Sequence, residues 1–164
     1  MARGNDTVIT SPPGGVFEEG IVATGETHYP GMIVQRDPSV ELSGGRHTYK
    51  IYNRDADGDQ PAGAYWVCTN LLNASIGKAQ TVSYTAGERA SYYSPRPGEE
   101  LNLLIENLSG TADDHALGEI LMVNDGTGKL IVTTGTPESE VAQLLEAITD
   151  PTADILAWCQ WSGK

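Results

Sequence analysis

The chain lacks any long hydrophobic run. No stretch approaches the roughly 20 apolar residues of a membrane-spanning helix. The first ten residues, MARGNDTVIT, also lack the apolar core of a secretory signal peptide. These absences predict a protein that is made in the cytoplasm, does not span a membrane and is not exported by a cleaved signal.

Positive charge is also scarce. The 164 residues include 10 lysines and arginines against 22 aspartates and glutamates, which gives a formal net charge of −12. Binding to nucleic acid depends on basic side chains that replace the counterions of phosphates, and binding to anionic lipid headgroups needs basic clusters. The balance therefore predicts neither nucleic acid nor a membrane surface as a partner.

Cysteine occurs only twice, at Cys68 and Cys159. The two residues are far apart and form no C-x-x-C pair, and both sit in apolar runs. This pattern favours two buried free thiols, although spacing alone leaves a disulfide open.

Recognisable catalytic motifs are missing as well. The three histidines, His28, His47 and His115, form neither H-x-H nor H-E-x-x-H. There is no G-x-S-x-G elbow and no phosphate-binding glycine fingerprint. The acidic run 55–59 starts like a calcium loop, but Gln60 and Trp66 stand where that loop needs Gly and Glu. We therefore predict no enzyme activity, no cofactor and no metal site.

What the sequence does contain is a β pattern. Nineteen glycines and nine prolines imply many tight turns and short elements. Short runs rich in apolar and β-branched residues recur about every ten residues, and Asp125-Gly126 supplies a hairpin turn between two of them. We predict a mainly β protein, a single small β-barrel with at most one short helix. The expected strands are 21–23, 32–34, 48–52, 65–68, 81–84, 89–93, 101–105, 120–123, 130–132 and 155–161.

The segment 137–149 is ambiguous. Thr136-Pro137-Glu138 has the chemistry of a helix start, and Val141, Leu144, Leu145 and Ile148 follow at helical spacing. Local propensity therefore favours a short helix here.

Residues 1–20 differ from the barrel segment 21–164. The run Thr10-Ser11-Pro12-Pro13-Gly14-Gly15 is incompatible with a helix and with a central strand. Apolar residues lie on both sides of it, and these need a surface to contact. We predict an extended N-terminal arm that docks on a neighbouring protein, with an unattached tail as the other interpretation. The predicted partner interface comprises Val8, Ile9, Pro12, Pro13, Val16 and Phe17.

Two stretches resemble the head decoration proteins of tailed phages, which are also called capsid cement proteins. The segment 29–34, with Pro30 and Gly31, resembles the "PGM-V" opening strand of that family. The segment 84–102, with Gly87 and then Pro95-Arg96-Pro97-Gly98, resembles its "Y-x-A-G-(D/E)-R … Y-x-P-R-P-G-(D/E)-E-(V/L)-N" stretch. The hairpin 125–130 is similar to the family's "dG-kL" turn, and the order along the chain matches from Gly25 to the C-terminus.

This resemblance implies a structural virion protein on the outer surface of the capsid, where it would cement neighbouring subunits of the major capsid protein. It implies a β-barrel or β-tulip fold and self-association, as a homotrimer or a dimer. The segment 142–150 resembles a family segment that forms a strand, and on that ground we favour a strand over the helix. The stretch 36–59 is longer than the family core, and its role is unassigned.

Two other functions compete with capsid binding. A β-rich ligand- or glycan-binding module would use exposed aromatic residues, for which Tyr49, Tyr52, Tyr65 and Trp66 are candidates. A small trimeric β-barrel enzyme would instead need polar residues that converge at subunit interfaces.

Overall fold

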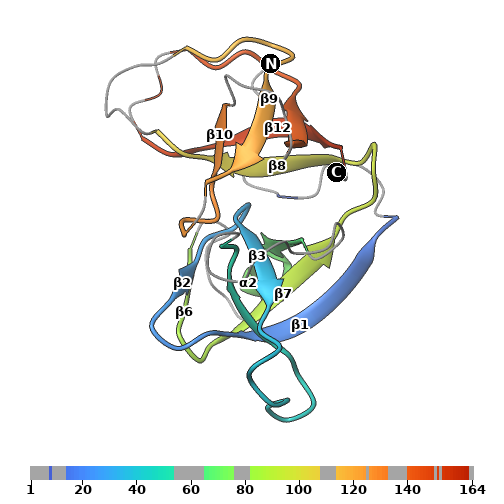
Figure 1. Ribbon diagram of the computed structural model, residues 1–164, viewed down its shortest axis with the longest axis vertical. Coiled ribbons are helices and arrows are strands. Elements are labelled where there is room, and N and C mark those ends of the chain that lie inside the picture. Colours follow the sequence, from blue (N-terminus) through green and yellow to red (C-terminus); the bar gives the residue numbers. More distant parts are fainter. Residues whose placement is uncertain are drawn as a thin grey trace.

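Two β-barrels stacked along the long axis form the protein (Figure 1). The computed structural model describes Val8 and residues 14–53, 65–75, 82–107, 114–124, 126–132, 140–149, 151 and 153–162. The N-terminal barrel contains strands between residues 16 and 94, and the C-terminal barrel contains strands between residues 100 and 161. The mainly β barrel class predicted from the sequence is confirmed, and its strands divide between two closed barrels.

The N-terminal barrel closes in the strand order β1-β4-β3-β5-β7. Four of its five contacts between neighbouring strands are antiparallel, and the contact between β1 and β4 is parallel. Its strands are β1 (Val16–Val22), β3 (Ile33–Arg36), β4 (Thr48–Ile51), β5 (Trp66–Thr69) and β7 (Arg89–Ser94).

The C-terminal barrel closes in the order β10-β8-β12-β11-β9. The predicted hairpin is present, because β9 pairs antiparallel with β10 around the 124–129 turn. Its strands are β8 (Glu100–Ile105), β9 (Ile120–Val123), β10 (Leu130–Val132), β11 (Glu140–Leu144) and β12 (Ile155–Trp161).

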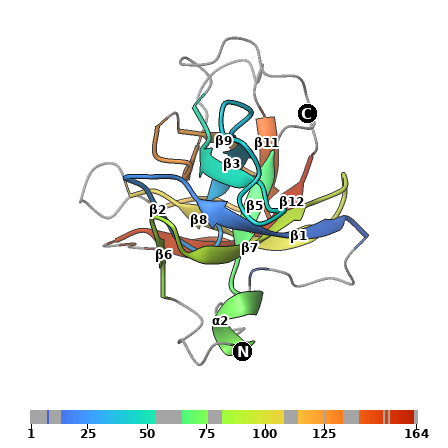
Figure 2. The same ribbon diagram turned by 90° about the horizontal axis from the view of Figure 1, so that it is seen from below.

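Two smaller elements complete the described fold. The strands β2 (Thr27–His28) and β6 (Tyr84–Thr85) form a two-stranded antiparallel sheet. The short helix α2 (Leu71–Ser75) follows β5 and packs on β7 (Figure 2). Asn70 precedes this helix, and its carbonyl accepts the N–H of Asn73 at 3.2 Å.

Strands of the N-terminal barrel are buried on both faces. In β5, Trp66 and Cys68 belong to the cluster of buried residues inside this barrel, whereas Val67 belongs to the cluster that fills the C-terminal barrel and the junction. In β7, Tyr92 faces the first cluster and Tyr93 the second. Alternate residues of a strand point to opposite faces, so one strand serves two cores. This explains why the 65–68 run is apolar without alternation.

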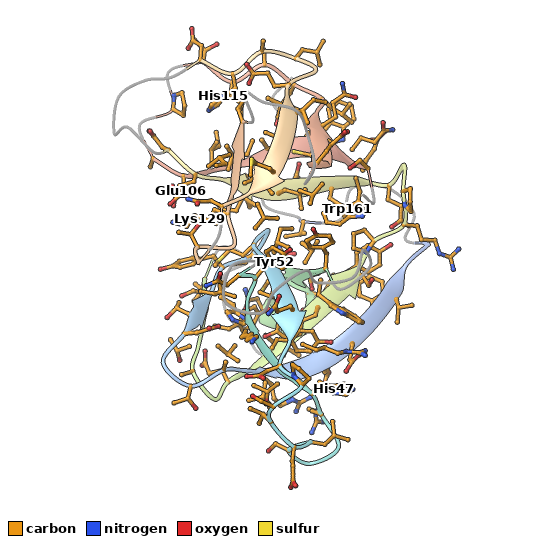
Figure 3. The ribbon with its side chains drawn as sticks, viewed as in Figure 1. His47, Tyr52, Glu106, His115, Lys129 and Trp161 are labelled. Atoms are coloured by element: carbon orange, nitrogen blue, oxygen red, sulfur yellow. The ribbon has the colours of Figure 1, made fainter. Side chains whose placement is uncertain are left out.

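Backbone hydrogen bonds tie the two barrels together. The N–H of Gly31 donates to Cys68 at 2.8 Å, and the carbonyl of Gly31 accepts the N–H of Leu104 at 3.0 Å. On the other side of the junction, Ile33 donates to the carbonyl of Gly128 at 2.6 Å. Tyr52 and Trp161 lie between the barrels (Figure 3), and Tyr65 contacts both rings.

Several predictions from the sequence can be compared with these elements. The segment 140–144 is strand β11, as the resemblance favoured, and the helix indicated by local propensity is wrong there. Pairing with β9 and β12 outweighs the local helical pattern.

Cys68 and Cys159 are both free and buried, as predicted.

The predicted boundary of the N-terminal arm is wrong. Residues 16–20 belong to β1, which pairs with β7 from Val16 onward, so the barrel begins at Val16 rather than after Gly20. Gly20 is required at its place, because a Cβ there would lie 2.4 Å from the Tyr49 ring. The predicted strand 21–23 is therefore only the end of a longer strand.

Candidate functional site

The six residues predicted as the partner interface have different environments. Ile9, Pro12 and Pro13 lie outside the described residues. Val16 and Phe17, at the start of β1, are 58% and 44% exposed. Val8 is fully buried and belongs to the core cluster of the C-terminal barrel and the junction.

Val8 therefore binds its own chain, and its assignment to an external interface is wrong. Its carbonyl accepts the N–H of Asn102 at 2.6 Å, and its N–H lies 3.5 Å from Oδ1 of Asn70. Asn102 is in β8 and Asn70 follows β5, so this contact links both barrels. The apolar character of Val8 was read correctly, but its partner is internal.

An open groove of about 370 Å³ lies on the outer face of the N-terminal barrel. One wall is the start of β1, the other is α2, and Ser91 of β7 is among the lining residues. Two exposed large apolar side chains, Phe17 and Leu71 (48% exposed), line it, and Val16 lies beside it. The full lining is Phe17, Glu18, Glu19, Leu71, Leu72 and Ser91.

Contacts with the underlying strands hold both walls of the groove in place. The ring of Phe17 packs on Tyr93 with 4.6 Å between centroids. The N–H of Leu72 donates to Oγ of Ser91 at 3.3 Å, and that hydroxyl also lies 2.5 Å from Oγ1 of Thr69. These contacts hold an apolar surface in place that the folded chain leaves open to solvent, which is characteristic of protein interaction sites.

Charged residues gather along the β1 side of the groove. Glu18 pairs with Arg36, and Nε2 of His47 lies 3.8 Å from the Glu18 carboxylate. Glu19 pairs with Arg89 and lies 3.6 Å from Nε of Arg46. Figure 3 places His47 at the end of the N-terminal barrel that is remote from the junction.

The electrostatic effects of this network follow from its contacts. The hydrogen bond from Arg89 lowers the pKa of Glu19, with smaller Coulombic contributions from Arg89 and Arg46. Burial alone would lower the pKa of Arg36, but hydrogen bonds to Tyr49 and Glu18 raise it above its usual value. The guanidinium of Arg36 also lies 4.6 Å from the centroid of the Trp66 ring. Both charged groups therefore stay ionised near neutral pH.

The residues that carry the family resemblance occupy turns and the barrel junction. Pro30 and Gly31 are buried at the junction, whereas Gly87 forms the exposed turn between β6 and β7. The residues Pro95, Arg96, Pro97 and Gly98 form the turn that connects β7 to β8 and so joins the two barrels. Gly31, Gly87 and Gly98 all have positive φ, which explains the glycines of the motif.

The aromatic residues proposed for ligand binding are mostly not available to a ligand. Tyr49, Tyr52 and Trp66 are 0%, 4% and 7% exposed, and only Tyr65 is partly exposed. Tyr49 stacks on Tyr92 with 3.9 Å between ring centroids. These rings form cores and the junction, so they provide no aromatic platform for a glycan.

One buried network of polar side chains was not predicted from the sequence. Nδ1 of His28, which is fully buried, lies 3.0 Å from the hydroxyl of Tyr92, and its Nε2 lies 2.9 Å from a carboxylate oxygen of Glu26. The same carboxylate oxygen accepts the N–H of Ile51 at 2.7 Å. The arrangement satisfies every member inside the protein and fastens the small β2–β6 sheet to the N-terminal barrel.

The described part of the chain holds no group of three His, Cys, Asp or Glu side chains arranged to bind a metal ion. The acidic run 55–59 lies outside that part. His115 lies 3.3 Å from the carboxylate of Glu119 and forms a simple pair. Among the described helices, none is long and apolar enough to cross a membrane.

Comparison with known proteins gives no assignment. No family model matches the sequence, and no curated protein matches it either. The functional argument therefore starts from the groove and from the motif residues.

Proposed function

We propose that this chain is a structural virion protein that binds the outer surface of a tailed-phage capsid and cements neighbouring major capsid subunits. The observation that carries the proposal is the groove between β1 and α2, with Phe17 and Leu71 exposed and held in place. A rigid, exposed apolar surface of this kind suits attachment to another protein.

The resemblance to head decoration proteins supplies the identity of that partner. The residues that carry this resemblance stand at turns and at the junction of the double barrel, so they fit a scaffold role. A net charge of −12 suits a protein on the outside of a shell, where it touches no genome. Many copies on one symmetric shell would add their separate contacts.

The proposal is tested by co-sedimentation of the purified protein with expanded, undecorated tailed-phage capsids. We expect saturation at a fixed ratio to the major capsid protein, and that ratio distinguishes a trimer at three-fold axes from a dimer at two-fold axes. Absence of binding to the cognate capsid, together with a hit in a glycan array, would overturn the proposal in favour of a ligand-binding module.

A pair of variants tests whether the groove is the attachment surface. Leu71→Asp removes an exposed apolar wall, and an acidic residue is compatible with the first turn of α2. We expect it to weaken capsid binding by about 30-fold or more, as for a central interface residue. Leu117→Asp, at a residue 67% exposed outside the groove, is the matched control and should bind as wild type.

A further inference from the structure

Among the residues that the structure describes, nothing pairs with one backbone edge of the first half of β1. Along β1, the N–H of Val22 points to β7 and donates to Glu88 at 3.0 Å. The N–H groups of Ile21 and Ala23 point the other way and donate to carbonyls at the β4 side, at 3.0 and 2.9 Å. Donors alternate along a strand, so Phe17 and Glu19 also direct their backbone groups to the β4 side.

Strand β4 does not reach these two residues. The register between β1 and β4 consists of Ile21 opposite Thr48 and Val22 opposite Tyr49. The pairing ends there, and the chain before Thr48 turns back on itself, with Ser43 and Arg46 bonded to each other through both backbone groups. Within the described residues, no strand therefore pairs with the Phe17 and Glu19 edge.

We propose that this edge of β1 accepts an extended segment of the major capsid protein as an additional strand, with its side chains beside the groove. This inference rests on the proposed function and specifies its contact. An exposed strand edge offers a ready row of backbone donors and acceptors, and strand addition is a common mode of peptide recognition. The apolar side chains of Phe17 and Val16 would then meet apolar side chains at alternate positions of the incoming strand.

The charges at the edge indicate the chemistry of the occupant. Of the six described lysines and arginines, Arg36, Arg46 and Arg89 surround Glu18 and Glu19, so three arginines face two glutamates in a strongly acidic chain. Arg46 lies on the open side of β1, where the incoming strand would run. An acidic side chain on that strand, next to its apolar residues, is the complementary arrangement.

A second copy of this chain is a poor occupant. Antiparallel pairing of two β1 edges would bring the adjacent Glu18 and Glu19 of one copy against those of the other. Like charges directly opposite one another destabilise a strand pair. The charged edge thus disfavours self-association and still admits a partner of opposite charge.

Backbone pairing is tested by two substitutions at one position. Glu19→Pro removes the outward N–H and is tolerable on an edge strand, whereas Glu19→Ala removes only the carboxylate. We expect the proline variant to bind expanded capsids at least about tenfold more weakly than the alanine variant, with both variants folded by circular dichroism. Equal affinities for the two variants would overturn strand addition.

Hydrogen–deuterium exchange gives a readout without any substitution. In the free protein, the amides of Phe17 and Glu19 should exchange fast, and those of Glu18 and Gly20 slowly, because the latter face β7. Addition of saturating capsids should slow the two fast amides in the peptide 14–22. Unchanged exchange of this peptide on protein that co-sediments with capsids would overturn the inference.

The charge of the occupant is tested by Arg46→Glu against Arg96→Glu, which changes the same charge at an exposed residue of the β7–β8 turn. Weaker binding of the first variant, by about fivefold at low salt and less at high salt, supports an acidic segment. If wild-type protein binds capsids and all the β1 variants bind equally well, only the strand inference fails. If wild-type protein binds no capsid, the proposed function fails and the inference fails with it.

Discussion

Gly31 shows how one residue sets the contact between the barrels. Its φ is +88°, and a Cβ at this position would lie 2.7 Å from the backbone nitrogen of Leu104 and 2.5 Å from Leu156. We expect Gly31→Ala to lower the free energy of unfolding by roughly 3 kcal/mol, since left-handed backbone costs about 1–2 kcal/mol and the clash adds a similar amount.

Gly87→Ala is the matched control for this prediction. Gly87 also has a positive φ, +79°, but nothing lies within 4 Å of its added Cβ. Only the backbone cost of about 1 kcal/mol should remain. Urea denaturation measures the free energy of unfolding of both variants. Equal decreases would show that the close approach of Leu104 and Leu156 to Gly31 adds no cost.

Glu99 gives the fold a dependence on pH. Burial alone would raise the pKa of its carboxyl, but hydrogen bonds from Tyr93 and from the backbone N–H groups of Arg96 and Gly14 lower it below the ordinary 4.5. A lowered pKa in the folded state means that the ionised form stabilises the fold above pH 4.5. That contribution is lost as the pH falls through the folded pKa.

The Glu99→Gln variant tests this dependence. Its free energy of unfolding should lie about 1 kcal/mol below that of wild type near neutral pH, since the carboxylate accepts charge-assisted hydrogen bonds. The difference should shrink as the pH falls below 4.5, where the wild-type carboxyl takes up its proton. A difference that stays constant between neutral pH and pH 4 would contradict this role of the ionised carboxylate.

At the scale of elements, the N-terminal segment acts as an internal fastening. Val8 is fully buried between β8 and the residue after β5, so Val8→Ala should lower the free energy of unfolding by about 2 kcal/mol. Val16→Ala, at a residue 58% exposed, should change it by less than about 0.5 kcal/mol. Thermal denaturation of both variants tests this difference in stability. A Val8 variant as stable as wild type would contradict the internal role and favour the external interface predicted from the sequence.

Because the N-terminal segment contacts its own chain, deletion of residues 1–20 is a poor test of capsid attachment. Removal of residues 1–20 would also remove five of the seven residues of β1, together with most of its pairing to β7. Loss of capsid binding by such a truncation would therefore report on barrel folding as well as on attachment. Substitutions within the groove avoid this ambiguity.

Strand positions followed from the sequence wherever local pattern decides structure. Alternating or short apolar runs bounded by Gly and Pro identified most strands, and Asp125-Gly126 identified the hairpin between β9 and β10. The division into two barrels did not follow, because closure depends on which distant strands pair. Local reasoning also gave a helix at 140–144, where cross-strand pairing prevails.

The candidate site was foreseen only in part. Val16 and Phe17 were predicted as interface residues from their apolar character beside a Pro-Gly run, and they line or flank the groove. Leu71 was missed, although Asn70 before an apolar pair is a weak helix-start signal. The open edge of β1 was not predictable, because it depends on where the pairing between β1 and β4 ends.

At the scale of the whole molecule, the two barrels share the larger of the two clusters of buried residues. The larger cluster of buried residues joins Ile33, Val67 and Tyr93 of the N-terminal barrel to the interior of the C-terminal barrel. Backbone hydrogen bonds through Gly31 and Gly128 cross the same junction. Neither barrel could separate without exposing this surface, so we expect one cooperative unfolding transition for the whole chain.

A substitution remote from the N-terminal barrel tests that coupling. Leu121 is fully buried in β9 of the C-terminal barrel, and Leu121→Ala should cost about 2–5 kcal/mol. In native-state hydrogen exchange, the slowest amides of β5 and β7 should lose the same protection as those of β8 and β12. Loss confined to β8 and β12 would mean that the barrels open independently. In that case the β1 edge and its groove would sit on a separately folding unit.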